Sequence, residues 1–234
     1  MADGQGNAME TQRMVEAIRG ITPQPITTVV VGSDHGDHTG GNSAFPASVT
    51  YLAHPTSKAI LEAGAGRGGG TPPKIEAVPE RRVLRMGGRE IQVLFLGRAH
   101  TGGDLSVYLP AEKILFMSEA FLNRVFPAMR SAYPSEWVKA IERAQAMDVT
   151  TYVPGHGFVE SPAVSKEELE RYRQALVQVI AEAKRLHAAS RTADQAAEEA
   201  RFQGLDDWVL RSSQAATAVR RVYSELNGEL PPLP

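Results

Sequence analysis

The apolar residues in the first half of the chain change their period several times, which predicts helices alternating with strands. Asn7 and Glu10 have the spacing of a capping box, and apolar residues follow at helical intervals as far as Ile18. The run ITTVVVG, residues 26–32, is β-branched and does not alternate with polar residues, so we expect a strand that is buried on both faces. A strand over residues 48–54 and a short helix over residues 56–63 are expected next.

The middle of the chain predicts two hairpins, then a helix and a last strand. Residues 81–97 are two apolar runs that turn at Gly87-Gly88, and residues 104–119 are two more that turn near residues 110–113. The glycine-rich stretch 64–73 has no periodicity and is typical of a mobile loop. A helix over residues 135–147 and a strand over residues 149–155 complete a pattern that indicates the α/β class.

The pattern becomes entirely helical after residue 160. Ser165 and Glu168 predict one helix start by capping-box spacing, and Thr192 predicts another. The first of these helices has one apolar face, made of Leu169, Tyr172, Leu176, Val179, Ile180 and Leu186. We therefore predict a domain over residues 1–160 and a C-terminal helical extension over residues 161–234 that packs on it. A separate partner-binding module is the alternative for the extension.

Composition and charge exclude several classes of protein. The 42% of hydrophobic and 22% of charged residues are typical of a globular protein, and a net charge of -2 favours neither nucleic acid nor an anionic membrane as a partner. The absence of cysteine excludes disulfides and thiolate metal sites. No apolar run is long enough for a membrane span, so we expect no membrane as a partner. The partner that we expect is a small-molecule substrate.

The compartment is left open by the sequence. The first ten residues have no basic region and no apolar core, so they do not form a signal peptide. The chain as given is therefore expected in the cytoplasm. A periplasmic or secreted protein is the alternative if an upstream signal was lost.

Four of the six histidines indicate a metal site. His35, His38, His100 and His156 lie next to glycine or aspartate, in segments that read as loops after strands. Loops at strand ends are where a rigid sheet can direct ligands at one point, and neutral imidazole binds zinc, iron and copper. In the DHGDH stretch, glycines nearby permit the tight turn that would present two histidines and Asp37 together.

Three motifs in the order HGDHTGG, AHTGGD and PGHG carry a resemblance to a known family. They are similar to successive metal-binding motifs of the metallo-β-lactamase-fold superfamily, and the resemblance runs from about residue 26 to residue 158. It implies an α/β fold that is a four-layer αββα sandwich, and metal-dependent hydrolysis as the activity. The C-terminal helices resemble extensions that some members carry.

The resemblance also implies a set of ligands, with two departures from the family pattern. Ser33 stands where the first histidine of the family is found, and Glu119 stands where the family usually has a bridging aspartate. The other positions match metal ligands of the family: His35, Asp37, His38, His100 and His156. One half-site, made of Asp37, His38 and His156, is therefore complete, whereas the other keeps only His35 and His100. Asp34 is expected to point away, because neighbours on an extended segment face opposite sides.

These ligands leave three interpretations open. In the first, one Zn²⁺ is bound tightly by Asp37, His38 and His156, with Glu119 as a candidate fourth ligand. The second site is then weak or empty, and Asp37 orients the attacking water. In the second, Glu119 joins His35 and His100 in a mononuclear Fe²⁺ site of an oxidoreductase. In the third, the site is a relic, and the protein is a homologue that acts in binding or assembly. The substrate of a hydrolase is not indicated, because ester, lactone, amide, thioester and phosphodiester all suit this chemistry.

The start of the chain departs from the family as well. Only 32 residues precede Ser33, too few for the strands that build most of one sheet, so we expect a sandwich shortened at its N-terminus. The first residues, MADGQG, are typical of a loop that leads into a helix. An apolar sheet face would then be exposed, unless a second copy in a homo-oligomer or the helical extension covers it. A truncated chain is the interpretation that we favour.

Overall fold

The computed structural model describes residues 1–64 and 74–232 and divides the chain into two compact units. The first unit contains residues 1–95 and 103–111, and the second contains residues 96–102 and 112–234. The loop predicted over residues 64–73 falls, apart from its first residue, outside the described residues. Each unit mixes helices with strands, so the predicted α/β class is confirmed.

A parallel sheet and the helix that covers it begin the first unit. Helix α1 (Ala8–Ile21) is capped by Asn7, whose side chain accepts a hydrogen bond from the amide of Glu10, as the capping-box spacing predicts. Strands β1 (Thr28–Val30), β2 (Thr50–Ala53) and β3 (Ile75–Ala77) follow in parallel order. Between them lie the short helices α2 (Gly36–Thr39) and η1 (Asn42–Ala44), and α3 (Pro55–Glu62).

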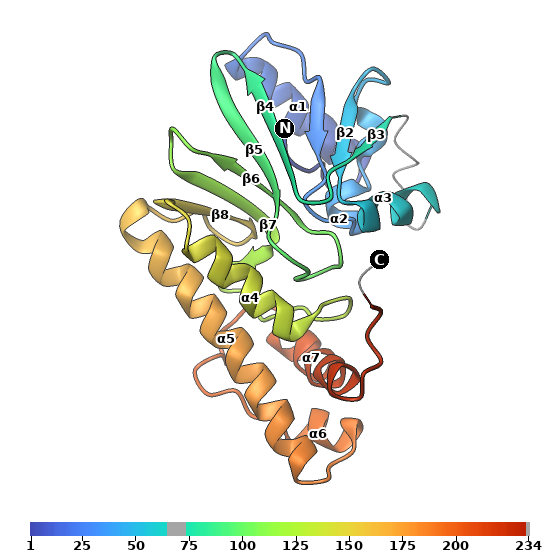
Figure 1. Ribbon diagram of the computed structural model, residues 1–234, viewed down its shortest axis with the longest axis vertical. Coiled ribbons are helices and arrows are strands. Elements are labelled where there is room, and N and C mark those ends of the chain that lie inside the picture. Colours follow the sequence, from blue (N-terminus) through green and yellow to red (C-terminus); the bar gives the residue numbers. More distant parts are fainter. Residues whose placement is uncertain (65–73, 233–234) are drawn as a thin grey trace. The chain divides into compact units, whose positions relative to one another are not determined.

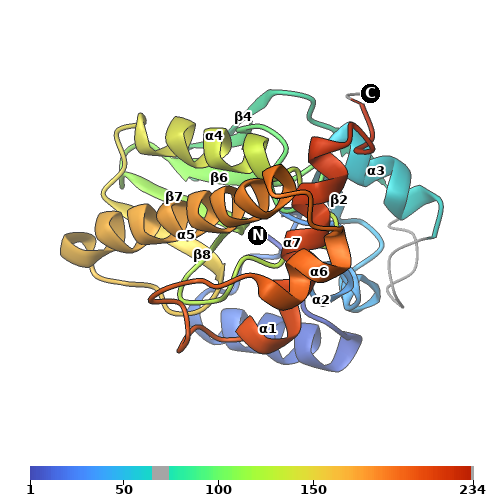
Figure 2. The same cartoon turned by 90° about the horizontal axis from the view of Figure 1, so that it is seen from below.

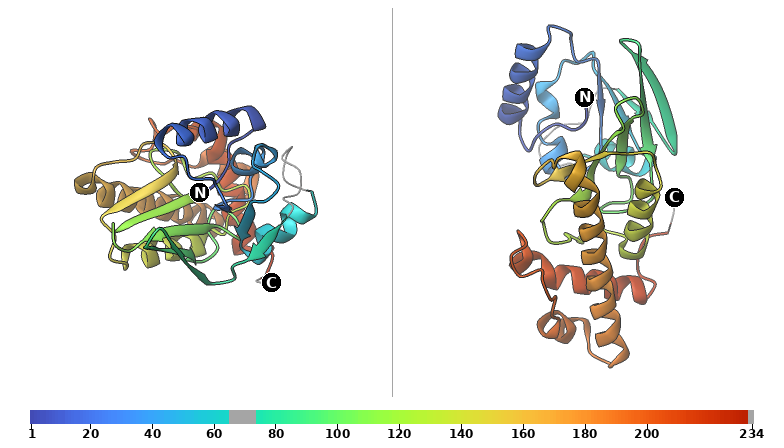
Figure 3. Two further views of the ribbon diagram at one scale, coloured as in Figure 1. Left: turned by 90° about the horizontal axis from the view of Figure 1, so that it is seen from above. Right: turned by 90° about the vertical axis from the view of Figure 1, so that its left-hand side faces the viewer.

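The sheet β1–β3 is buried on both faces within this unit. Val29 and Val31 of the β1 segment pack toward Val15 of α1, which lies alongside the strands in Figure 3. Val30 points the other way, because side chains alternate along a strand, and it packs with Val93 and Leu105. The strand expected from residues 26–32 is therefore buried on both sides, as predicted.

The second half of the first unit is an antiparallel set of strands. Strands β4 (Arg81–Met86) and β5 (Arg89–Phe95) form the predicted hairpin, with Gly87 and Gly88 at positive φ in the turn. Strand β6 (Leu105–Leu109) pairs antiparallel with β5. Because β1 and β2 pack on β5 and β6, this part of the sheet does not have the bare apolar face that a shortened sandwich would leave.

The first three residues pair with β1, although the sequence was typical of a loop there. Ala2 forms a parallel bridge with Val30, and the amide of Val30 donates to the carbonyl of Met1. The amide of Asp3 donates to the carbonyl of Val30, and the Asp3 side chain is buried. The prediction missed this segment, because three residues with no apolar periodicity give no strand signal of their own.

A β-α-β arrangement begins the second unit. Strands β7 (Ile114–Leu122) and β8 (Thr151–His156) pair in parallel, and α4 (Pro134–Gln145) connects them. Parallel neighbours require a crossover of this kind. Helix α4 packs on β7 through Trp137, which is fully buried and donates a hydrogen bond from Nε1 to the carbonyl of Ala120. The helix and strand predicted for residues 135–147 and 149–155 are both found.

Three helices complete the second unit. Helix α5 (Pro162–Ala188) packs on α4, β7 and β8, and α6 (Ala193–Glu199) and α7 (Arg211–Leu226) lie toward its C-terminal end (Figures 1 and 2). The six residues predicted to form the apolar face of α5 are all buried. Thr192 and Gln195 form the predicted capping box at the start of α6.

The predicted start of α5 was wrong. The helix begins at Pro162 after Ser161, because proline is pre-organised for the first helical position. The two residues taken for its capping box serve tertiary contacts instead. Ser165 Oγ accepts a hydrogen bond from the amide of Tyr152 at 2.7 Å, and Glu168 binds Arg124.

The boundary at residue 160 is not one of the boundaries between the compact units, since residues 112–160 belong to the same unit as α5 to α7. The division into a domain over residues 1–160 and an extension over residues 161–234 therefore stays a prediction. Over the ranges that the structure describes, none of the helices combines the length and the apolar character that crossing a lipid bilayer requires.

Candidate metal centre

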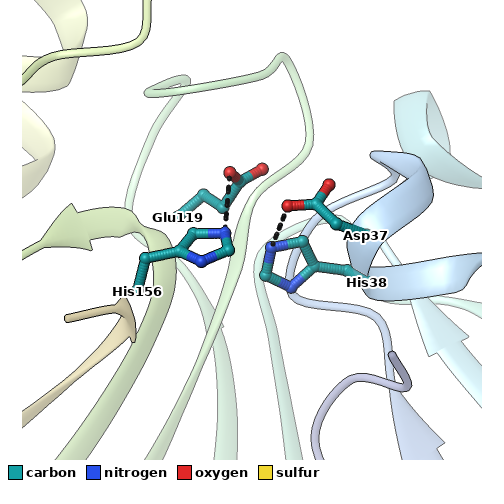
Figure 4. A group of neighbouring side chains, drawn as sticks. All are labelled: Asp37, His38, Glu119 and His156. Atoms are coloured by element: carbon teal, nitrogen blue, oxygen red, sulfur yellow. Dashed lines mark ion pairs between the residues drawn. The ribbon is translucent and has the colours of Figure 1, made fainter. Parts of the chain in front are cut away.

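The first unit presents three of the predicted ligands on one short segment that follows β1. His35 is the N-cap of α2, Asp37 lies in the first turn of this helix and His38 follows it. The His38 side chain is buried, with 6% of its surface exposed, whereas 53% of the Asp37 side chain is exposed. His38 Nε2 lies 3.7 Å from Asp37 Oδ2, as Figure 4 shows. The single helical turn therefore brings the two side chains together.

A buried carboxylate holds the other side of the His38 ring. Asp3 Oδ2 lies 2.9 Å from His38 Nδ1, and Asp3 Oδ1 accepts a hydrogen bond from the amide of Gly32 at 2.6 Å. An imidazole that binds a metal usually donates its second ring proton to a carboxylate or carbonyl, which fixes its tautomer and orientation. Asp3 therefore keeps the proton of His38 on Nδ1 and leaves Nε2 as the ligand atom. Sequence reasoning missed Asp3, because 35 positions separate the two residues.

Ser33 and Asp34 precede these ligands and have other roles. Ser33 is fully buried, and its hydroxyl oxygen accepts a long hydrogen bond of 3.4 Å from the amide of His35. Asp34 Oδ2 accepts a hydrogen bond of 2.7 Å from Ser57 of α3. The carboxylate of Asp34 is thus tied to a neighbouring helix, in agreement with the expectation that it points away from the ligands.

The glycines of the first motif are required by close packing as much as by the turn. Gly40 has ordinary helical dihedral angles, with φ at -59° and ψ at -24°. A Cβ atom at Gly40 would lie 2.3 Å from the carbonyl oxygen of Gly6, and one at Gly41 would lie 1.8 Å from Oγ1 of Thr11. The segment that leads into α1 therefore packs directly on the backbone after α2, which the turn interpretation did not foresee.

The second unit brings the other three predicted ligands together around one carboxylate. Glu119 Oε2 lies 3.1 Å from His100 Nε2, and Glu119 Oε1 lies 3.5 Å from His156 Nε2. Glu119 and His100 are buried, whereas 42% of the His156 side chain is exposed. Figure 4 shows the contact between Glu119 and His156. Each oxygen of the carboxylate thus faces a different imidazole.

His100 is held by a layer of aromatic and backbone contacts. Its ring lies edge-on to Trp137, with 5.3 Å between the ring centroids. The preceding residue, Ala99, accepts a backbone hydrogen bond from Tyr133 at 2.9 Å. The start of α4 therefore fixes the segment 96–102, which is the only part of the second unit that precedes residue 112 in the chain.

An irregularity in β7 directs Glu119. Ser118 pairs with Pro154 and Leu122 pairs with His156, so three residues of β7 stand opposite the single residue Gly155. Ser118 itself has a φ of 46°, which is unusual for a residue other than glycine. Bulges of this kind re-aim side chains and are frequent beside functional sites. The bulge places Glu119 between the two histidines.

Two glycines bring His156 close to β7. A Cβ atom at Gly155 would lie 2.6 Å from the carbonyl carbon of Ser118, and one at Gly157 would lie 2.1 Å from the carbonyl oxygen of Asn123. Gly157 also has a φ of +94°, which favours glycine. The two glycines of PGHG are therefore explained by close packing, because the end of β8 lies directly on the backbone of β7 and of Asn123.

Two arginines that lie near the ligands in the sequence, Arg98 and Arg124, form ion pairs. Arg98 Nε donates to Glu136 at 2.9 Å, and its guanidinium stacks on Tyr133 at 3.9 Å. Arg124 makes two hydrogen bonds to Glu168, of 2.7 and 2.9 Å. The hydrogen bond from Arg124 holds the pKa of Glu168 below its usual value, and the same bond raises the pKa of Arg124. Both arginines thus bind carboxylates within their own unit.

The donor types of both units fit a divalent metal. Imidazole nitrogens and carboxylate oxygens are ligands of zinc and of iron, and the contact between Asp3 and His38 supplies the support that such ligands usually have. The two oxygens of the Glu119 carboxylate face two different imidazoles, an arrangement that suits a ligand shared between two neighbouring metal positions. The geometry within each unit is therefore suitable for metal binding.

Comparison with known proteins identifies the class. The family model of the metallo-beta-lactamase superfamily matches residues 4–156, which is more than half of the chain. The protein belongs to this superfamily, and the resemblance seen in the sequence is confirmed. Residues 157–234, which include α5 to α7, lie outside the matched range.

The individual relatives are distant. The chain is 27% identical to 2,4-dinitroanisole O-demethylase subunit alpha of Nocardioides sp. (strain JS1661) over 135 residues, which are 57% of this chain and 41% of that protein. It is 23% identical to a metallo-beta-lactamase type 2 of Bacillus cereus over 154 residues, which are 64% of this chain and 59% of that protein. The chain thus spans about half the length of the curated relatives it matches.

Solved structures show the same fold. The sec-alkylsulfatase Pisa1 from Pseudomonas sp. superposes with a TM-score of 0.72 at 19% identity, over 100% of this chain and 47% of that one. A metallo-beta-lactamase from Pontibacter korlensis superposes with a TM-score of 0.63 at 23% identity, over 74% of this chain and 80% of that one. The metallo-β-lactamase fold with C-terminal helices is thereby confirmed.

Proposed function

We propose that the protein is a metal-dependent hydrolase that cleaves an ester, lactone, amide or similar bond of a small organic molecule. The observation that carries the proposal is the position of Glu119, whose two carboxylate oxygens face His100 and His156. A carboxylate whose two oxygens face two imidazole nitrogens brings together donor types that zinc and other divalent cations prefer. Membership of the superfamily supports the same activity.

In this proposal the ligands of both units act together. Asp37, His38 and His156 would hold one Zn²⁺ tightly, and His35, His100 and Glu119 would form a second site that Ser33 weakens. A bound zinc ion lowers the pKa of its water to near 7 and polarises the bond to be cleaved. The Asp37 side chain is 53% exposed, and it would accept a hydrogen bond from the attacking water and so orient it. Asp3 keeps His38 in the tautomer that binds through Nε2.

An apolar surface beside His156 supports an organic substrate. Phe158 and Val159 follow the histidine by two and three positions, and they are 76% and 60% exposed. Two residues of extended chain span at most about 7 Å, so an organic group beside His156 can reach the Phe158 ring. The relatives named above are a lactamase, an O-demethylase and an alkylsulfatase, and their names describe reactions on small organic compounds.

The alternative function is that of a mononuclear iron enzyme. One observation favours it, since two histidines and one carboxylate meet within the second unit. Non-haem iron oxygenases use this donor set with open positions for their reactants. The third possibility, a homologue that acts in binding or assembly, predicts that these residues hold no metal.

Metal analysis and a hydrolysis assay separate these functions. We expect protein purified without added metal to contain about one zinc per chain and to hydrolyse members of a panel of ester, lactone and amide substrates. Glu119→Gln is expected to lower the activity by 100-fold or more, about 3 kcal/mol in activation free energy. Glu199→Gln, a change to a carboxylate that is paired with Arg191 on the surface, is the control and should leave activity unchanged. Stoichiometric iron without hydrolysis, or no metal at all, would contradict the proposal.

A further inference from the structure

The segment that follows His156 is held by the residue that comes directly after β7. Asn123, the residue after this strand, is 2% exposed. Its Nδ2 donates to the carbonyl oxygen of Phe158 at 2.9 Å and lies 3.4 Å from Glu160 Oε1. Its backbone amide donates to the carbonyl of His156 at 3.0 Å. One asparagine therefore binds the chain at the histidine and again two residues beyond it.

These contacts matter because the His156 side chain is 42% exposed, so the backbone that carries the ring contributes to its position. On the N-terminal side, the close approach of Gly155 to Ser118 fixes this backbone. On the C-terminal side, Gly157 has a φ of +94° and only permits the conformation, so a further contact is needed to select it. The side-chain amide of Asn123 provides that contact through its hydrogen bond to the carbonyl oxygen of Phe158.

We propose that Asn123 is a positioning residue for His156, and that its side-chain amide keeps the imidazole where it shares a metal with the other ligands. The inference rests on the proposed function. The asparagine does not touch the ring. It acts through the backbone of residues 156–158, which its two donors hold against the end of β7. A change at Asn123 is therefore expected to weaken metal binding through the geometry of His156.

The test compares Asn123 with Ser165, a buried serine of α5 that bonds to the start of β8. Asn123→Ala removes the side-chain donor, and Asn123→Asp keeps the shape but has no N–H to donate. Ser165→Ala removes the hydroxyl that accepts from Tyr152 at 2.7 Å, at the start of β8. Asn123→Ala thus loses a hydrogen bond to Phe158 just beyond β8, and Ser165→Ala loses one to Tyr152 at the start of β8, so only the first change affects the segment at the histidine.

Calorimetric titration of Zn²⁺ into the metal-free protein measures the effect, together with the absorption spectrum of the Co²⁺-loaded protein. We expect the first metal to bind about tenfold more weakly in both Asn123 variants, the low end of the range for supporting residues. The Co²⁺ spectrum should change as well, because the geometry of a ligand has moved. Ser165→Ala should lower the melting temperature and leave zinc affinity and the Co²⁺ spectrum as in the wild type.

Equal zinc affinity in Asn123→Ala and the wild type would overturn the proposal, and so would an equal loss in Ser165→Ala. If the Asn123 variants do not fold, Gly157→Ala displaces the same segment from Asn123 and should show the same tenfold loss. Unchanged affinity in that variant would overturn the inference. A wild-type protein that takes up no metal would instead overturn the proposed function itself.

Discussion

In the first unit the predicted ligands are neighbours in the sequence, whereas in the second they are collected from three separate segments. His35, Asp37 and His38 occupy a single turn after β1. His100, Glu119 and His156 come from a loop, from a bulged strand and from the end of the next strand. The first set is arranged by local geometry, and the second depends on how a β-α-β arrangement packs.

The support of the ligands differs in the same way. In the first unit a carboxylate contacts the ligand ring directly, through Asp3 and His38. In the second unit the backbone positions Glu119 and His156, through the bulge at Ser118 and the close contacts of Gly155 and Gly157. Where a ligand is held through its ring, an isosteric change of charge in the supporting residue should alter metal affinity. Where a ligand is held through its backbone, a change of shape in the supporting residue should do so. The variants of Asn123 and Gly157 described above test the support in the second unit, and the following predictions test the first unit.

Removal of the exposed ligand of the first unit should have the largest effect. We expect Asp37→Ala to weaken the first metal uptake by several kcal/mol, since one of three protein ligands of the tight site is lost and each 1.4 kcal/mol is about tenfold. Calorimetric titration measures the change. Asp194→Ala, at an exposed carboxylate that pairs with Arg220, is the control. First uptake that is unchanged in Asp37→Ala would show that the tight site lies elsewhere.

Loss of the Asp3 carboxylate, which contacts His38 Nδ1, should have the next largest effect. Asp3→Asn keeps the shape but presents an amide to His38 Nδ1, which moves the ring proton to the nitrogen that binds the metal. We expect a 10- to 100-fold loss of zinc affinity, the usual range for such a contact. Asp34→Asn is the matched control, because that buried side chain still accepts from Ser57. An equal loss in both variants would point to folding and not to the tautomer of His38.

Restoration of the family histidine should raise the metal content. Ser33→His supplies the missing third imidazole of the weaker site, so we expect uptake to rise from about one toward two metals per chain. Ser33→Ala, which adds no ligand, should leave the stoichiometry unchanged. Because Ser33 is fully buried, the larger ring must displace its neighbours, and thermal denaturation should be recorded alongside the titration. Two tightly bound metals in the wild type would contradict the unequal sites.

The smallest expected effect is a pH dependence of stability within the first unit. Burial lowers the pKa of His54, whose Nδ1 accepts from the amide of Thr56 at the start of α3. The unfolded chain then binds more protons, so the contribution of His54 to stability is present above about pH 6.5 and is lost as the pH falls through the folded pKa. Denaturant titrations at pH 8 and pH 5.5 should show a smaller pH effect in His54→Asn, which keeps a capping side chain. An equal effect in both proteins would assign the dependence to other groups.

The elements and the local motif could be predicted from the sequence, because both depend on neighbouring residues. The two helix starts at Asn7 and Thr192 and the turn at Gly87-Gly88 follow from residue type and spacing. The same reasoning failed at Ser165, whose hydroxyl binds a backbone amide of β8. A capping-box pattern cannot distinguish a local partner from a distant one.

The supporting residues of the site could not be predicted, because their partners are remote in the chain. Asp3 meets His38 across 35 positions, and the Asn123 side chain meets Phe158 across another 35. Neither residue belongs to a motif, and both have types that are common in loops. The family resemblance located Glu119, but it gave no indication that a bulge with a left-handed Ser118 directs its carboxylate.

The second unit is built from two separate segments of the chain, which has a consequence for synthesis on the ribosome. Its first segment, residues 96–102, emerges before β6 and well ahead of the rest of the unit, from residue 112 onward. His100 is therefore synthesised well before α4 and β8. Glu119 lacks its second imidazole partner, His156, until that residue has left the exit tunnel. The set of His100, Glu119 and His156 is therefore incomplete during synthesis until residue 156 has been made, and a metal that requires all three ligands would bind only after that point.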